Sequence, residues 1–153
     1  MKISQILSPE ATFCSVSISS KKKILEKVSE EMSKSIDCPA QDIFESLFAR
    51  ERLGTTGLGE GIAIPHGRIT ACEKATAVFL LLDEAIDYDA PDGKPVDIIF
   101  AILVPENANS EQLKFLAEIA EVLSQPNVVS QIRHAHCGDA LFQIIDQATQ
   151  RLH

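Results

Sequence analysis

The sequence predicts a mixed α/β fold (α+β), in which helices sandwich a mixed β-sheet. Apolar runs typical of buried strands lie in the middle of the chain, at residues 75–82 and 96–104. Segments in which apolar residues recur at helical spacing lie on both sides of these runs. Because strands and helices interleave only partly, the pattern does not indicate a regular doubly wound βαβ series.

The first third of the chain predicts one strand and two helices. Apolar residues and serines alternate over residues 14–19, which is typical of a strand with one buried face. Two segments with helical spacing follow, the first with Ser19 or Ser20 as its N-cap and the second ending at Gly54. Their apolar positions are Ile24, Leu25, Val28 and Met32, and then Ile43, Phe44, Leu47 and Phe48.

The rest of the chain predicts two further strands and three helices. Residues 75–82 are apolar at nearly every position and predict a central strand covered on both faces. Asp92-Gly93 indicates a turn before the run at 96–104, which Pro105 closes. Three helical segments follow, the first ending at Pro126 and the second before Gly138.

Length and charge exclude several classes of function. The 153 residues, of which 45% are hydrophobic, predict a single domain over residues 1–153. The net charge of −8 argues against nucleic acid or anionic lipid as partners.

No apolar run approaches the ~20 residues of a membrane span, and the N-terminus lacks an export signal. Four cysteines without a C-x-x-C pair predict reduced thiols. We therefore expect a cytoplasmic protein that does not insert into a membrane.

Residues 54–68 form the most unusual segment, since they contain five of the seven glycines. Such a density lets backbone amides approach and surround an anion. The segment lacks the G-x-x-x-x-G-K-[ST] pattern of a phosphate-binding loop, and no strand precedes its Gly-x-Gly-x-Gly string. Both common nucleotide-binding motifs are therefore excluded.

The same segment contains the strongest candidate for chemistry. A short apolar strand at residues 62–64 leads into Pro65-His66-Gly67-Arg68, where Gly67 leaves the approach to the imidazole open. A neutral imidazole is a competent nucleophile that can hold a covalent phosphoryl group, and Arg68 can neutralise the charge of the transferred oxygens. The alternative is that His66 only completes a hydrogen-bond network within the loop.

The other histidines are weaker candidates. His134 and His136 precede Cys137 near a helix end, but no fourth metal ligand is evident, so we expect surface residues. A His-based hydrolase is disfavoured because the G-x-S-x-G motif does not occur. The sequence thus predicts neither a metal site nor a cofactor.

Residues 50–67, with the sequence RERLGTTGLGEGIAIPHG, closely resemble the signature of enzyme IIA domains of the fructose/mannitol class (EIIA type 2). These domains belong to the bacterial phosphoenolpyruvate:sugar phosphotransferase system (PTS), and the best match is its nitrogen-regulatory branch. The resemblance extends along nearly the whole chain, including residues 95–97 and 100–105. It implies a helix-covered mixed sheet and a phosphotransferase component that acts as a phosphocarrier.

The resemblance also implies a partner and site residues. A histidine phosphocarrier protein of the HPr type, here its nitrogen-branch relative, would donate a phosphoryl group to Nε2 of His66. The phosphorylation state would then control regulatory target proteins. The family places an arginine at the position of Arg50 near the site, which competes with Arg68 for this role. We expect backbone groups to complete a phosphate cradle at Thr55, Thr56, Gly57 and Gly67.

One position departs from the family pattern. Members usually have a second active-site histidine near the start of the helix after the last strand, where this chain has Gln112. Glutamine can donate a hydrogen bond to a phosphoryl oxygen but supplies no positive charge. Alternatively, Gln112 caps its own helix three residues after Asn109. Two alternative functions therefore remain open: a regulatory binding module that is not phosphorylated, and a sugar-branch (fructose/mannitol) IIA component.

Overall fold

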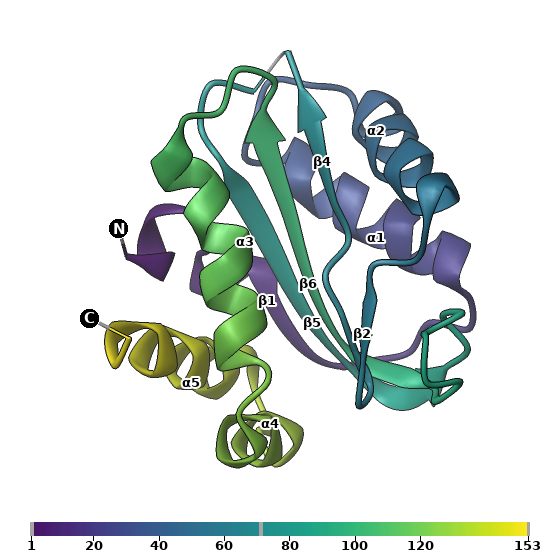
Figure 1. Cartoon of the computed structure of the whole chain (residues 1–153), viewed down its shortest axis with the longest axis vertical. Coiled ribbons are helices and arrows are strands. Elements are labelled where there is room, and N and C mark those ends of the chain that lie inside the picture. The colour runs from purple at the N-terminus through teal and green to yellow at the C-terminus, as the bar shows by residue number, and fades with distance from the viewer. Residues whose placement is uncertain (1, 71, 153) are drawn as a thin grey trace.

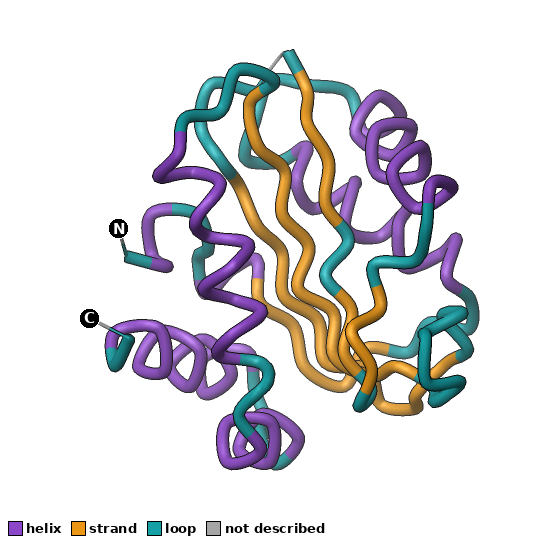
Figure 2. The backbone as a smooth tube through the Cα atoms, viewed as in Figure 1, coloured by secondary structure: helices purple, strands orange, loops and turns teal. Residues whose placement is uncertain are grey.

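The computed structural model describes residues 2–70 and 72–152. Five α-helices and six strands make up most of this part of the chain (Figures 1 and 2). Two short 3₁₀ helices, η1 (Ile3–Gln5) and η2 (Pro9–Ala11), precede them. The strands are β1 (Thr12–Val16), β2 (Gly57–Gly59), β3 (Ile62–Ala63), β4 (His66–Ile69), β5 (Thr76–Ile86) and β6 (Val96–Pro105). The helices are α1 (Lys21–Ser33), α2 (Ala40–Leu53), α3 (Ser110–Val122), α4 (Pro126–Arg133) and α5 (Gly138–Gln150).

The strands form one mixed sheet in the order β1-β5-β6-β3-β2. The remaining strand, β4, also pairs with β6, next to the later residues of β6 that follow those paired with β3. The central strands β5 and β6 are antiparallel, whereas β3 and β4 both run parallel to β6. Ile64 and Pro65 separate β3 from β4, and Pro65 has no N–H group to donate to a ladder. The interruption makes His66 the first residue of β4, opposite Ile102 of β6.

Helices cover both faces of this sheet, as the sequence predicts. Figure 1 shows α1 and α2 on one face and α3 on the other, with α4 and α5 below and beside α3. The strands β5 and β6 supply much of the core, where the rings of Phe79 and Phe100 pack with their centroids 5.2 Å apart. A mixed sheet between two helical layers is the predicted fold class.

Most helices confirm the sequence prediction, but two strands differ at their ends. The first strand spans Thr12–Val16 instead of residues 14–19, because Ser15 has a positive φ of 55° and the pairing with β5 shifts register between Phe13 and Val16, which interrupts the alternation. The strand predicted at residues 75–82 extends to Ile86.

The Ser20 hydroxyl caps α1 by accepting from the N–H of Lys23 at 3.2 Å, and α2 ends at Gly54. The second helix differs on its apolar face, because Phe48 is 37% exposed and stacks on Phe44 instead of entering the core. The glycine-rich segment differs as well, since it contributes β2 and β4 in addition to the predicted short strand.

None of the helices within residues 2–70 and 72–152 is both long enough and apolar enough to cross a bilayer.

Candidate functional site

The predicted acceptor residue, His66, lies in a cavity of about 430 Å³ at the outer side of β4, between α2 and α3. The cavity is open to solvent, and the imidazole of His66 is half-buried in its wall. The lining residues come from α2, β4, the end of β6 and α3: Ser46, Ala49, Arg50, Leu53, His66, Gly67, Arg68, Val104, Leu113 and Leu116.

The imidazole of His66 has a defined orientation. Its Nδ1 atom lies 2.9 Å from the carbonyl oxygen of Ile64, two residues earlier in the chain. A carbonyl oxygen can only accept a hydrogen bond, so Nδ1 donates and keeps the proton of the neutral ring. The lone pair is then on Nε2, which is the atom that the resemblance names as the phosphoryl acceptor.

Arg50 lies in the last turn of α2 and lines the same cavity. Its Nη1 atom donates to the carbonyl oxygen of Gly54 at 2.8 Å, which restrains the side chain near the end of its helix. A guanidinium group has five N–H donors in a planar fork, so this bond leaves other donors for an anion. The structure thus brings Arg50 and His66 together across more than a dozen residues of sequence.

Arg68 lines the cavity too, but its side chain is exposed. With Arg50 it makes the lining cationic, and among the described lining residues none is acidic. This is notable in a chain with a net charge of −8. Positive charge in a concave surface raises the local concentration of anions, so the cavity suits an anionic group.

Gly67 lets α2 pack closely against β4 beneath the cavity. A Cβ atom at this position would lie 2.6 Å from the hydroxyl oxygen of Ser46. That hydroxyl in turn donates to the carbonyl oxygen of Arg68 at 2.8 Å. Glycine at position 67 therefore allows the strand that contains His66 to lie close against the helix that contains Arg50, and the bond from Ser46 to Arg68 joins the two elements.

The other predicted cradle residues lie elsewhere. Thr55, Thr56 and Gly57 do not line the cavity. The N–H of Thr56 donates to the carboxylate of Glu51 at 3.2 Å, and the N–H of Gly57 donates to the Thr55 hydroxyl at 3.1 Å. Both amides have internal partners, so in this conformation they are not available to a phosphoryl group at His66.

Gln112 likewise stands outside the residues that line the cavity, although its neighbour Leu113 lines it. Its side-chain oxygen accepts from the N–H of Asn109 at 3.0 Å, and its own N–H donates to the Asn109 side chain at 2.9 Å. These two bonds are a capping box at the start of α3, which confirms the capping alternative for Gln112.

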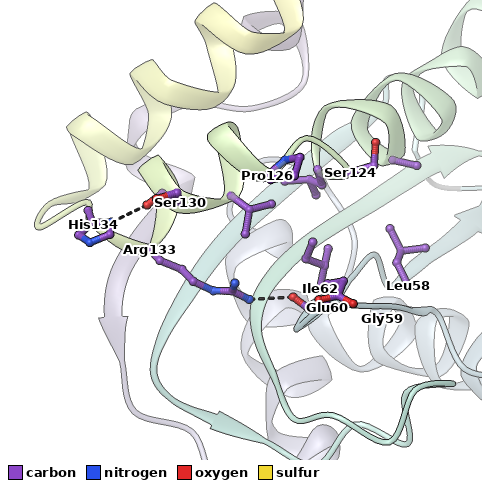
Figure 3. Close-up of a pocket in the computed structure, with 12 residues that line it drawn as sticks. Leu58, Gly59, Glu60, Ile62, Ser124, Pro126, Ser130, Arg133 and His134 are labelled. Carbon is purple, nitrogen blue, oxygen red and sulfur yellow. Dashed lines mark hydrogen bonds between the residues drawn. The ribbon is translucent and has the colours of Figure 1, made fainter.

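A larger cavity, of about 530 Å³, lies between β2–β3 and the α3–α4 region. Figure 3 shows Arg133 reaching across it toward Glu60, whose carbonyl oxygen accepts from Nη2 of Arg133 at 2.8 Å. His134 bonds through Nδ1 to the carbonyl oxygen of Ser130 at 2.7 Å. Among the described residues, no group of three or more His, Cys, Asp or Glu side chains is placed to bind a metal ion.

Two features near His66 have no counterpart in the sequence prediction. Leu53 is 86% exposed and Leu113 is 36% exposed, so apolar side chains reach solvent at the cavity. Glu51 is buried and bonds to Thr56 and Tyr88. The exposure of Leu53 could have been predicted from the sequence, because Leu53 lies between Arg52 and Gly54 at a helix end. The bond between Glu51 and Tyr88 could not, because the two residues are 37 positions apart.

Comparison with known proteins identifies the family of the chain. Residues 5–148 match the family described as "Phosphoenolpyruvate-dependent sugar phosphotransferase system, EIIA 2". The chain is 46% identical to a nitrogen regulatory protein homolog of Haemophilus influenzae, over 98% of this chain and 94% of that protein. It is 42% identical to a nitrogen regulatory protein of Pseudomonas aeruginosa, over 95% of each chain.

A solved structure agrees with these relatives. The nitrogen regulatory protein IIA-Ntr of Neisseria meningitidis is 38% identical and superposes with a TM-score of 0.90, covering 94% of this chain and 98% of that one. The family model and the relatives thus each span nearly the whole chain. The chain belongs to the EIIA 2 family of the phosphoenolpyruvate-dependent sugar phosphotransferase system and is similar to its nitrogen regulatory members.

Proposed function

We propose that this protein is a phosphocarrier and regulator of the nitrogen branch, and that Nε2 of His66 accepts its phosphoryl group. The donor is a histidine phosphocarrier protein of the HPr type. The observation on which the proposal depends is the bond from Nδ1 of His66 to the Ile64 carbonyl oxygen. This bond leaves the Nε2 lone pair free in a cavity with two arginines and without an acidic group among its described lining residues.

The transfer step needs no metal or cofactor. Nε2 of His66 attacks the phosphorus of the donor's phosphohistidine; the new N–P bond forms as the donor's N–P bond breaks, and the donor imidazole leaves with that electron pair. Positive charge then develops on the ring of His66, and it strengthens the bond that Nδ1–H donates to Ile64. Arg50 and Arg68 stabilise the charge on the phosphoryl oxygens.

The surroundings of the cavity support a protein as the donor and as the target. Leu53 and Leu113 present apolar surface next to the acceptor, as is typical of the centre of a protein–protein contact. A phosphoryl group adds about −1.5 to −2 charges at this surface. The added charge changes which protein surfaces can dock there, and this is how the phosphorylation state controls its partners.

The nitrogen branch is proposed over the sugar branch because of the relatives. The two curated relatives reported above are named nitrogen regulatory protein or its homolog, and each is more than 40% identical over nearly the full chain.

The proposal is tested by phosphoryl transfer in a reconstituted system. The protein is incubated with phosphoenolpyruvate, the general phosphotransferase enzyme of the system and its histidine phosphocarrier, and its intact mass is then measured. We expect the wild type to gain one acid-labile, base-stable phosphoryl group, and His66→Ala to gain none.

His134 is a matched control for this experiment, since its Nδ1 atom also bonds to a backbone carbonyl oxygen and leaves Nε2 unbonded. His134→Ala should be phosphorylated like the wild type. If the wild type gains no mass while the donor is phosphorylated, the protein is a binding module and the proposal is wrong. Loss of phosphorylation in His134→Ala but not in His66→Ala would contradict the assigned acceptor.

A further inference from the structure

A buried polar cluster lies at the end of α2, next to but outside the cavity that contains His66. Its centre is the carboxylate of Glu51, whose side chain is only 3% exposed. The Nζ atom of Lys21 lies 2.8 Å from Oε2, and the hydroxyl of Tyr88 donates to Oε1 at 3.1 Å. Thr56 donates to the same carboxylate through both its N–H group and its hydroxyl.

The burial of its carboxylate and the number of its hydrogen-bond partners distinguish Glu51 from an ordinary surface carboxylate. Burying a charge is costly unless it is paired and hydrogen-bonded, and Glu51 has a cation and three hydrogen-bond donors from Thr56 and Tyr88. None of these residues lines the His66 cavity. The cluster thus lies outside the lining of the cavity, and its hydrogen bonds reach the cavity through backbone groups.

Two short hydrogen-bond paths connect the cluster with the cavity. On the first path, the carbonyl oxygen of Thr56 accepts from the N–H of Ile64 at 3.1 Å, and the carbonyl oxygen of Ile64 accepts from Nδ1 of His66 at 2.9 Å. Glu51 thus fixes Thr56, Thr56 fixes the peptide at Ile64, and Ile64 orients the imidazole.

The second path leads to the arginine. The N–H of Gly54 donates to the carbonyl oxygen of Glu51 at 3.2 Å, and the carbonyl oxygen of Gly54 accepts from Nη1 of Arg50 at 2.8 Å. Thr56, two residues after Gly54, is in turn bonded to the carboxylate of Glu51. The turn that presents the Gly54 carbonyl group is therefore held by Glu51 on both sides.

We infer that Glu51 is a positioning residue for phosphoryl transfer: through Thr56 it holds the Ile64 and Gly54 carbonyl groups that orient His66 and Arg50. This inference rests on the function proposed above. It also gives Thr56 a different role from that of a phosphate ligand, because its donors stabilise the buried carboxylate while its carbonyl group restrains Ile64.

The test compares Glu51→Gln with Glu31→Gln. Glutamine keeps the size of the side chain but loses the charge and one acceptor oxygen, which loosens the hold on Thr56. Glu31 is a matched control, because it is 9% exposed and bonds to Lys27 of α1 and to Lys34, the residue directly after α1, and does not line the cavity that contains His66. Both variants remove a nearly buried, paired carboxylate, but only one of these carboxylates is connected to the cavity.

The first measurement is the tautomer of His66 in the unphosphorylated protein, read from imidazole nitrogen shifts by NMR. The second is the rate of transfer from the phosphorylated carrier. We expect Glu51→Gln to show a mixture of tautomers at His66 and a kcat lower by about 10- to 100-fold. The KM for the carrier should change little, because the docking surface is intact. Glu31→Gln should keep the wild-type tautomer and kcat.

A single Nδ1–H tautomer and wild-type kcat in folded Glu51→Gln would overturn the inference. If Glu51→Gln fails to fold, Tyr88→Phe removes only one donor to the carboxylate and should shift both readouts in the same direction by a smaller amount; unchanged readouts there would also overturn it. Failure of the wild type to accept phosphate would refute the proposed function instead, and the tautomer comparison would still decide the role of Glu51.

Discussion

The guanidinium group of Arg50 donates a 2.8 Å hydrogen bond to the carbonyl oxygen of Gly54, four residues later in the chain. This contact spans the end of α2 and keeps a cation beside His66 in the cavity. A cation in the last turn of a helix also suits the helix dipole. The bond to Gly54 therefore holds the Arg50 side chain at the cavity that β4 lines with His66.

Replacing Arg50 should therefore slow phosphoryl transfer without unfolding the protein. Arg50→Ala removes a charged donor to the phosphoryl oxygens, and we expect a rate lower by roughly 10- to 100-fold. Arg50→Lys should recover part of this loss, because it keeps the charge but not the planar fork. Rapid-quench measurement of transfer from the phosphorylated carrier checks both variants.

Arg52 provides the control for this prediction. It lies in the same turn of α2, is exposed, and packs over the ring of Phe48 at 5.8 Å rather than lining the cavity. Arg52→Ala should leave the transfer rate within twofold of wild type, a margin set by the small effects of most surface substitutions. Equal losses in the two alanine variants would mean that overall charge, and not the position of Arg50, determines the rate.

Leu53 should contribute to donor docking. Its side chain is 86% exposed at the edge of the cavity, so Leu53→Ser should change the free energy of unfolding by less than about 0.5 kcal/mol. We expect its KM for the phosphocarrier to rise about fivefold, which corresponds to ~1 kcal/mol of lost contact. Leu58 is 49% exposed and lines the other cavity, so Leu58→Ser should leave KM unchanged. An identical KM in Leu53→Ser and wild type would place the docking surface elsewhere.

Gly67→Ala should destabilise the protein through Ser46. The added Cβ would meet the Ser46 hydroxyl oxygen at 2.6 Å, and such overpacking costs about 1–3 kcal/mol. Ser46→Ala removes that oxygen, so the double variant should be more stable than the sum of the two single changes predicts, by ~1 kcal/mol. Chemical denaturation of all four proteins measures this coupling; strict additivity would show that the Ser46–Gly67 approach is not the source of the loss.

Tyr88 should remain protonated for as long as the protein is folded. Burial and the charge of Glu51 raise the pKa of Tyr88 well above its ordinary value of 10.0. As the pH rises past about 10, the unfolded chain releases this proton first, so the free energy of unfolding must fall. Tyr88→Phe should be less stable than the wild type near neutral pH, because Glu51 loses a donor. Above about pH 10, however, the free energy of unfolding of Tyr88→Phe should fall less steeply with pH than that of the wild type.

The readout for this prediction is direct, since Tyr88 is the single tyrosine of the chain and there is no tryptophan. The tyrosinate absorbance should appear together with the loss of helical circular dichroism in an alkaline titration. Tyrosinate absorbance in a protein with native circular dichroism would contradict the buried bond between Tyr88 and Glu51.

The helices were predictable because each has a local signal that acts over several turns. The hydroxyl of Ser20 and the residue Gly54 mark helix ends through contacts within a few residues, and the capping role of Gln112 follows from its spacing to Asn109. Phe48 was misplaced because helical spacing assigns it to the apolar face, whereas only tertiary packing decides how far that face is covered.

The glycine-rich segment was only partly predictable, because strands of two to four residues are too short to show a period. The sequence singles out His66 through its proline and glycine neighbours, but it does not say which amides already have partners. Thr56 and Gly57 have internal ones. Glu51 is in the last turn of a helix with two arginines, and its burial depends on Tyr88, with which it has no local relationship in sequence.

The central claim, that Nε2 of His66 is the phosphoryl acceptor, is tested most directly by NMR of the isotopically labelled, phosphorylated protein. The coupling between phosphorus and the imidazole nitrogens identifies the phosphorylated atom. We predict that phosphorus is bonded to Nε2 of His66 while Nδ1 keeps its proton and its bond to Ile64. Phosphorus on Nδ1, or on any other residue, would contradict the account.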